Sequence, residues 1–283
     1  MNNPRHELDY IEINPQGLDK ESIRSLILAT ESRSQVLWIK GGLNYLSQED
    51  WYSFLANDCN LQPDRRHFET HQKGNSDHVR IKESDWWEIS YQPEKANSYA
   101  YSSTSQPLHN DNAWFKDAAE INFNIMVKQA SEGGASTIYP CWRLVQDLQN
   151  EDSELLHMLK TIKVTIRKGN DPSVGRETTI LTLDGSCSSH WNYYRTVRDG
   201  NLVDEMCERF FEFLQDKERS NKLTRINLRT GDCLVWNDQL VLHGRDKFKA
   251  TKKYDRILRQ SMWKLRPKNN HKERNIYESN NLR

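Results

Sequence analysis

The feature that most constrains the fold is a long succession of short, strand-like segments that begins near residue 77. Each segment is rich in β-branched and aromatic side chains, and turn-forming residues separate it from the next. The segments span residues 78–82, 87–91, 121–127, 161–167, 178–183, 191–196, 223–228, 233–236 and 257–263. So many short strands are incompatible with a helical bundle, and they predict a sandwich or a barrel.

Four segments carry apolar residues at helical spacing instead. They lie at 19–30, from 47 onward, at 142–159 with a break expected near Asn150, and at 202–214. Asp19, Ser47 and Asn201 are expected to cap three of these helices, because short polar side chains bond to free amides of a first turn. Residues 36–39 are expected to form a buried strand, and residues 60–76 a loop without periodicity. The pattern predicts a mainly β protein with flanking helices, most similar to a double-stranded β-helix, or jelly-roll barrel.

Length indicates a single domain. A chain of 283 residues can bury one substantial core, and we expect residues 1–265 to form it. Residues 266–283 are rich in Lys, Arg, Asn and His. Segments of this composition bury little apolar surface, so we expect a polar, basic tail that is solvated or disordered.

Charge and cysteine content argue against several classes of protein. The 40 Lys and Arg residues balance the 40 Asp and Glu residues, so no overall field attracts nucleic acid or an anionic membrane. The 5 cysteines are odd in number and form no Cys-x-x-Cys pair, which argues against a disulfide framework or a zinc ribbon. The N-terminus is polar and no apolar run approaches a membrane span, so we expect a soluble, cytoplasmic protein.

Two short motifs far apart in the chain offer metal-ligating side chains. His109 and Asp111 are two residues apart, so on one strand both side chains would point to the same face. Residues 230–245 have the pattern of a turn, a strand, a polar turn and a second strand that delivers His243. Two imidazoles and one carboxylate leave the opposite face of an octahedron open, an arrangement that suits ferrous iron in oxygenases. A His-x-Asp pair alone is weak evidence, and the specificity comes from the conjunction.

These residues, in this order, resemble the taurine and 2,4-dichlorophenoxyacetate dioxygenase-like family of Fe(II)/2-oxoglutarate-dependent oxygenases. Between the two motifs, the Gly-Gly-Ala-Ser run at 133–136 is similar to the family's Gly-Gly-x-Thr signature, with Ser136 in the hydroxyl position. The resemblance extends from the strand and glycine turn at 36–41 to the last strand near Trp263. It implies a single oxygenase domain over most of the chain.

The resemblance also implies the chemistry of the site. His109, Asp111 and His243 would bind Fe(II), and 2-oxoglutarate and O2 would complete the coordination. Turnover would release succinate and CO2 and oxidise a C–H bond of the substrate. Because related halogenases have a small residue at the position of Asp111, its carboxylate favours hydroxylation. Desaturation and cyclisation use the same ligands and stay open.

The last strand carries the residues expected to hold the cosubstrate. By resemblance, Arg256 is the first arginine of the family's Arg-x-x-x-Arg pattern and binds the distal carboxylate of 2-oxoglutarate, which Ser136 also contacts. Gln260 replaces the second arginine and is expected to contact the substrate. Arg259 lies on the other face of a regular strand. A bulge would exchange the faces, so Arg259 stays an alternative cosubstrate ligand.

Substrate identity is the least constrained part of the prediction. Asn112 and Trp114 follow the first motif and are candidate substrate contacts, although Trp114 is equally well explained as a core residue. Residues 60–106 and 168–195 are the expected sources of pocket loops. These features favour a small polar or amino-acid-derived molecule of natural-product biosynthesis, either free or bound to a carrier.

Two other classes of protein can use the same residues. A zinc hydrolase can be built from two histidines and a carboxylate, but the chain has no His-Glu-x-x-His helix, and the hydrolase leaves Arg256 and the paired glycines unexplained. A noncatalytic jelly-roll binding module would use His109 and Asp111 only to shape a loop. The oligomeric state is not predicted.

Overall fold

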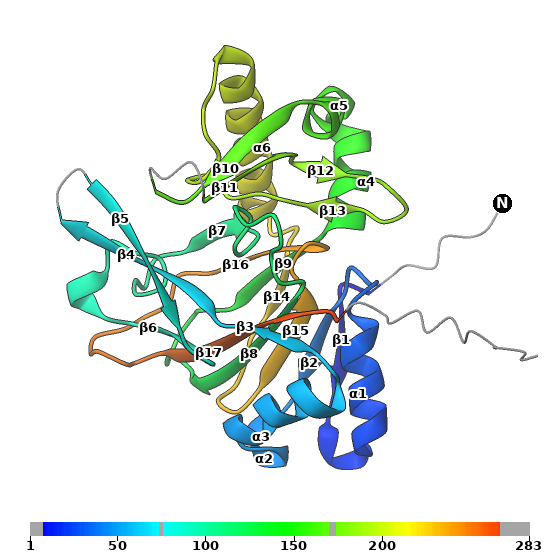
Figure 1. Cartoon of the computed structure of the whole chain (residues 1–283), viewed down its shortest axis with the longest axis vertical. Helices are drawn as coiled ribbons and strands as arrows, with labels where there is room; N and C mark the ends of the chain where they lie inside the picture. The colour runs from blue at the N-terminus through cyan, green and yellow to red at the C-terminus, as the bar shows by residue number, and fades with distance from the viewer. Residues whose placement is uncertain (1–7, 74–75, 170–173, 267–283) are drawn as a thin grey trace, which may run out of the picture.

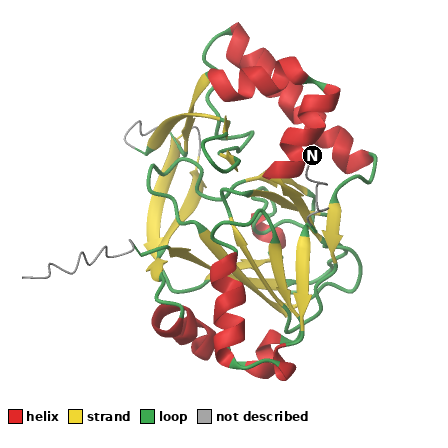
Figure 2. Ribbon diagram, turned by 90° about the vertical axis from the view of Figure 1, so that its right-hand side faces the viewer, coloured by secondary structure: helices red, strands yellow, loops and turns green. Residues whose placement is uncertain are grey.

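The structure is a computed structural model that describes residues 8–73, 76–169 and 174–266 (Figure 1). The tail predicted for 266–283 lies outside the described residues except for Arg266. Two β-sheets occupy the middle of the molecule, and helices gather at two opposite ends (Figures 1 and 2). The prediction of a mainly β protein with flanking helices is confirmed. Closure of the sheets into a barrel stays a prediction.

The larger sheet has seven strands, and the last strand of the fold lies next to the two short strands that form one edge. Its order is β1-β2-β15-β8-β17-β3, and β6 also pairs with β17. All pairs are antiparallel except β1 with β2. The strands are β1 (Tyr10–Ile13), β2 (Val36–Ile39), β3 (Gln62–Asp64), β6 (Trp87–Ser90), β8 (Ile121–Lys128), β15 (Cys233–Asn237) and β17 (Ile257–Lys264).

The smaller sheet has four antiparallel strands in the order β14-β9-β16-β7. They are β7 (Gln106–His109), β9 (Ser136–Pro140), β14 (Thr224–Ile226) and β16 (Val241–Arg245). Side chains from both sheets line one common pocket, so the two sheets face each other across it.

Alternation along β8 shows how the larger sheet divides its two faces. Ile121, Phe123 and Ile125 belong to an apolar cluster on the outer face. Helices α1 (Lys20–Ala29), α2 (Gly42–Tyr45) and α3 (Gln48–Ser53), with the π-turn Phe54–Asp58, contribute to that cluster. Asn122 and Asn124 have the opposite parity and are turned inward, toward the smaller sheet. One face of the sheet is thus core, and the other is available to a site.

The predicted caps of the first two helices are confirmed. Asp19 Oδ1 accepts a hydrogen bond from the Ser22 amide at 2.7 Å, and Ser47 Oγ accepts one from the Asp50 amide at 3.1 Å. Each cap satisfies an amide that the first turn leaves free, and it fixes where the helix begins.

A second apolar cluster lies at the other end of the molecule, between helices and short strands (Figure 1). The elements at this end of the molecule are α4 (Cys141–Glu151), α5 (Ser153–Thr161), α6 (Asn201–Arg219), β10 (Lys163–Arg167), β11 (Gly175–Thr179), β12 (Leu181–Thr182) and β13 (Ser188–Ser189). The predicted break near Asn150 is confirmed, because Asp152 ends α4 and caps α5 through the Leu155 amide at 3.0 Å.

Three predictions of local structure are wrong. Gly200, at φ 89°, precedes the first turn of α6 in place of Asn201, because glycine adopts this backbone conformation without strain. Residues 60–76 are not a loop, since they include β3 and β4 (Arg66–Lys73). β4 pairs only with β5 (Ser76–Glu83), and a hairpin outside the main sheets needs no apolar alternation. Residues 191–196 form a turn whose aromatic groups pack on α6 rather than a strand.

None of the described helices combines the length and the apolar character needed to cross a bilayer.

Burial of His190 makes the stability of the fold depend on pH. The residue is 5% exposed, and its Nδ1 lies 3.4 Å from Arg176 Nη1. Burial and the positive charge of Arg176 lower the pKa of His190 from 6.5 to about 3. The unfolded chain therefore binds a proton below pH 6.5 that the folded chain does not bind. This contribution to stability is complete above pH 6.5 and is lost as the pH falls toward 3.

We predict that His190→Gln flattens the loss of stability between pH 7 and pH 5. One proton corresponds to about 1.4 kcal/mol per pH unit, and the glutamine side chain does not take it up. Urea unfolding at a series of pH values measures the slope for each protein. Equal slopes for the wild-type protein and the variant would contradict the assignment of the proton to His190.

Candidate functional site

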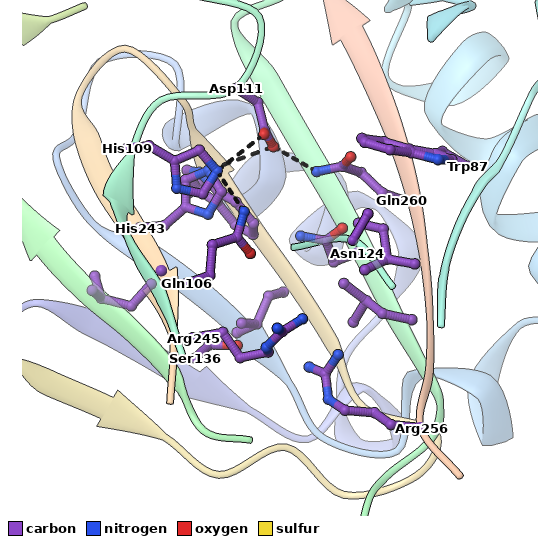
Figure 3. Close-up of a pocket in the computed structure, with 17 residues that line it drawn as sticks. Trp87, Gln106, His109, Asp111, Asn124, Ser136, His243, Arg245, Arg256 and Gln260 are labelled. Atoms are coloured by element: carbon purple, nitrogen blue, oxygen red, sulfur yellow. Dashed lines mark hydrogen bonds and ion pairs between the residues drawn. The ribbon is translucent and has the colours of Figure 1, made fainter. Parts of the chain in front are cut away.

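A pocket between the two sheets contains most of the predicted site (Figure 3). Its polar lining residues are Gln106, His109, Asp111, Asn124, Ser136, His243, Arg245, Arg256 and Gln260. Its other lining residues are Trp87, Ile89, Ala100, Ile138, Leu234, Trp236, Gly244 and Leu258. The smaller sheet contributes the two histidines, and the larger sheet contributes the facing wall with Gln260 and Asn124.

The pairing of β7 with β16 brings the two histidines together. His109 and His243 are direct partners in this antiparallel pair, and their ring centroids are 4.4 Å apart. Gly244 permits the strands to approach this closely. A Cβ there would lie 2.6 Å from the Gln106 carbonyl oxygen and 2.8 Å from Thr137 Oγ1. The glycine after His243 is therefore a packing requirement of the site.

Asp111 reaches the histidines from a turn, so the expectation that it shares a strand with His109 is wrong. The strand ends at His109, because the Asn110 side chain bonds to the Val241 carbonyl at 3.3 Å and to the Trp191 amide at 2.9 Å. Asn112 follows in the left-handed region at φ 52°. These two asparagines turn the chain so that Asp111 points back into the pocket.

The resulting cluster has the dimensions of a metal site. Asp111 Oδ1 lies 3.4 Å from His109 Nε2, and Asp111 Oδ2 lies 3.5 Å from His243 Nε2. One ligand atom from each of the three residues lies within 4.8 Å of the others. His109 Nδ1 is 2.9 Å from the Pro107 carbonyl oxygen, so it carries the hydrogen and leaves Nε2 as the lone-pair donor. Gln106 Nε2 lies 3.0 Å from His109 Nε2 and can donate a hydrogen bond to it.

Electrostatics at this end of the pocket favour a cation. Burial alone would raise the pKa of Asp111, but the two imidazoles, His243 foremost, hold it well below its usual value. Burial opposes the charging of His243 too, but Asp111 and Asp238 raise its pKa to about 10. Asp238 Oδ1 lies 3.2 Å from His243 Nε2. The negative charge of Asp111 and Asp238, which raises the pKa of His243, would also attract a metal ion.

The opposite end of the pocket carries two buried cations. Arg256 is 3% exposed and Arg245 is 5% exposed, and neither has a carboxylate partner among the described residues. Burial, with the charge of Arg245, lowers the pKa of Arg256 to about 9, and burial lowers that of Arg245 to about 10. Arg245 Nη2 donates to the carbonyls of Tyr99, Ser102 and Thr104 at 3.2, 3.1 and 2.8 Å. Within the described part of the chain, the Nε atoms of both arginines have no hydrogen-bond partner, so this end is suited to an anion.

The paired glycines leave room for the side chain of Arg256. Gly133 and Gly134 both have φ 75°, which glycine adopts without strain. A Cβ on Gly134 would lie 3.3 Å from Arg256 Nε and 3.2 Å from Phe248 Cβ. The turn thus leaves room for the guanidinium beside Ser136, which also lines the pocket.

Three residues predicted for the site do not line the pocket. Arg259 points to the other face of β17 and forms an ion pair with Glu88 at 2.6 Å, as regular alternation requires. Trp114 is part of the apolar cluster around α4 to α6. Asn112 donates to Met262 Sδ at 3.0 Å and shapes the turn. The structure therefore gives structural explanations for Asn112 and Trp114 and places Arg259 away from the pocket.

Several pocket residues were missed from the sequence. Asn124, which lines the pocket, and Asn122, which bonds to Asp111, were detectable, because asparagines alternate with large apolar residues along β8 and mark its inward face. Trp87 pairs with Gln260 across β6 and β17, and such a pairing is not visible in the sequence. The sequence does not indicate that Arg245 lines the pocket, apart from its place two residues after His243.

Comparison with known proteins decides the family. A family model described as "Taurine catabolism dioxygenase TauD, TfdA family" matches residues 15–262. The chain belongs to this family. A curated uridine-5'-phosphate dioxygenase from Streptomyces sp is 25% identical over 179 residues, which are 59% of this chain and 65% of that protein. The chain thus spans slightly less than two thirds of the length of that relative.

Solved structures of non-heme iron oxygenases share the fold. The oxygenase OrfP in complex with Fe and alpha-ketoglutaric acid superposes with a TM-score of 0.59 at 14% identity, over 87% of this chain and 79% of that one. Asparagine oxygenase in complex with Fe(II), 2S,3S-3-hydroxyasparagine and succinate has a TM-score of 0.58 at 14% identity, over 87% and 79%. PvcB from Pseudomonas aeruginosa has a TM-score of 0.58 at 15% identity, over 90% and 84%.

Family membership indicates the chemistry to expect. The TauD/TfdA family uses Fe(II), 2-oxoglutarate and O2. Membership thus favours this chemistry over the alternatives of a zinc hydrolase and of a noncatalytic binding module. The donor set fits the iron, since two imidazoles and one carboxylate converge within the pocket, with one ligand atom of each residue within 4.8 Å of the others.

We predict that His109→Ala, Asp111→Ala and His243→Ala each lower the affinity for Fe(II) and abolish turnover while the fold survives. The three side chains converge on one another in the pocket rather than on an apolar core, so their loss costs little packing. Metal content after anaerobic loading and gel filtration, with circular dichroism as the control for folding, measures the effect. Full iron content in any of the three variants would refute the assignment.

Proposed function

We propose that Fe(II) is held by His109, Asp111 and His243 and that 2-oxoglutarate lies between the metal and Arg256. The observation that carries the proposal is the division of charge within one pocket. A metal-ligating triad stands at one end, and a buried arginine without a carboxylate partner among the described residues stands at the other. A dicarboxylate that chelates the metal through one end would offer its other carboxylate to Arg256.

The protein supplies binding and orientation, and the iron with its cosubstrate supplies the oxidising chemistry, in which decarboxylation of 2-oxoglutarate to succinate and CO2 accompanies oxidation of a substrate C–H bond. Arg256 and Ser136 bind the distal carboxylate. Apolar side chains also line the pocket and would exclude water around the chelate; they are Ile138, Leu234 and Leu258. In such surroundings the attraction between a guanidinium and a carboxylate is stronger than in water.

We propose that the substrate is a small, free molecule with an N–H donor and that it is hydroxylated. Gln260 uses its Nε2 within the protein, so its buried Oε1 is left without a partner beside the metal end. Such an acceptor favours a ligand that donates a hydrogen bond. Trp87 pairs with Gln260 across the strands and adds an aromatic wall. Asp111 keeps the third ligand position occupied, which favours hydroxylation.

The names of the compared proteins and of the molecules bound to them agree with a substrate of this class. They name uridine-5'-phosphate, hydroxy derivatives of arginine, and hydroxyasparagine, all small polar molecules with N–H groups. The test is a screen of amino acids and nucleotides for substrate-dependent succinate formation, with mass spectrometry of the products. A gain of one oxygen atom in a compound with an N–H donor is the expected result. Substrate-independent succinate formation across both compound classes would count against the proposal.

We predict that Arg256→Ala raises the Kd for 2-oxoglutarate by about 30-fold or more. Removing one partner of a desolvated charge pair costs about 2–5 kcal/mol. Arg259→Ala is the matched control, because it removes an arginine from the same strand whose side chain pairs with Glu88 on the other face. Anaerobic titration with 2-oxoglutarate in the presence of Mn(II) measures both variants. If Arg259→Ala abolishes binding and Arg256→Ala does not, the register assigned to β17 is wrong.

A further inference from the structure

We propose that Asn122 and Gln260 are positioning residues that fix the carboxylate of Asp111 in the orientation needed to bind the metal. The inference rests on the metal site proposed above and adds two amide side chains to it. Neither amide belongs to the ligand triad, and both come from the larger sheet, across the pocket from the two histidines.

The two amides lie on the same face of neighbouring strands. Gln260 on β17 pairs with Asn124 on β8, and Met262 pairs with Asn122, so Asn122 and Gln260 are diagonal neighbours. Their side chains point inward together, because residues two apart on a strand share a face. Asn122 is 0% exposed and Gln260 is 2% exposed, so water does not compete for their hydrogen bonds.

Both amides donate to the same oxygen of Asp111. Gln260 Nε2 lies 2.7 Å from Asp111 Oδ2, and Asn122 Nδ2 lies 2.9 Å from it (Figure 3 shows the first of these bonds). Gln260 Nε2 also lies 2.9 Å from Asn122 Oδ1, which closes the network. The carboxylate accepts and cannot donate, so this arrangement assigns the nitrogen and oxygen of each amide. Asp111 Oδ2 is occupied, and Oδ1 receives no amide donor.

Asp111 depends on these bonds more than the histidines depend on their neighbours. His109 and His243 stand on paired strands, whereas Asp111 lies in a turn followed by a residue with positive φ. No strand pairing fixes the backbone of Asp111, so its side chain needs other contacts to hold its orientation. The two amides supply that limit and leave Oδ1, on the side of His109, as the oxygen available to a metal. Groups that orient a metal ligand in this way typically contribute a factor of about 10–100 to metal affinity.

The bonds to Asp111 also explain why position 260 carries a glutamine. The family's pattern places an arginine there, and a guanidinium would offer its donors to an acidic substrate group. The glutamine instead directs its donor at Asp111 and leaves a neutral acceptor, Oε1, for the pocket. Gln260 thus has two proposed roles. Its Nε2 orients the carboxylate of Asp111, and its Oε1 contacts the substrate.

The experiment measures binding of Co(II) to the full-length apoprotein by its visible absorption, which requires no turnover. Gln260→Met and Asn122→Leu remove the donors with little change of volume, and each is expected to raise the Kd for Co(II) about 10–100-fold. Arg259→Gln is the control on the same strand, and it is expected to bind like the wild-type protein because Arg259 faces away. Circular dichroism and thermal unfolding establish that each variant is folded.

A double-mutant cycle separates positioning from a general effect on structure. In an Asp111→Ala background, Gln260→Met and Asn122→Leu should cause no further loss of Co(II) affinity at the two remaining histidines, because the group that they orient is gone. Equal losses in both backgrounds would overturn the proposal, and so would unchanged affinity in the single variants. If the wild-type protein binds no Co(II), the proposed metal site itself fails and this inference fails with it.

Discussion

The antiparallel pairing of β7 with β16 is the constraint on which the site depends. It sets His109 directly opposite His243, and it is possible only because Gly244 lets β16 lie against Gln106 and Thr137. The turn that follows β7 then returns Asp111 to the two imidazoles. One pairing therefore fixes the two histidines and the start of the turn that carries Asp111.

The larger sheet completes the site through the parity of two strands. Its outer face is apolar and is covered by α1 to α3, while its inner face carries Asn122, Asn124 and Gln260. The cost of burying these amides is offset where they bond to Asp111 and to each other. Gln260 Oε1 and the Nε atoms of Arg245 and Arg256 remain without partners. These atoms lie where the proposed substrate and cosubstrate would bind, which is a common location for incomplete hydrogen bonding.

Much of this organisation follows from the sequence, and the exceptions have physical reasons. Short strands, helix caps and the order of the motifs predicted the mainly β fold and the family, because those signals are local or depend on chain order. The turn that carries Asp111 could not be predicted from the sequence. The strand before it ends through contacts of the Asn110 side chain with Val241 and Trp191, which are distant in the sequence. The hairpin at 66–83 lacks the alternation of a sheet packed on a core. Trp87 is near the metal end only through cross-strand pairing with Gln260, which no single segment reveals.

The central claim is that one chelate links the triad to Arg256 across the pocket. The most direct measurement is anaerobic titration of the iron-loaded protein with 2-oxoglutarate, followed by visible absorption. The account predicts a weak metal-to-ligand charge-transfer band that saturates at one equivalent and that needs a much higher 2-oxoglutarate concentration in Arg256→Ala. No band with stoichiometric iron, or a band whose dependence on 2-oxoglutarate is unchanged in Arg256→Ala, would contradict it.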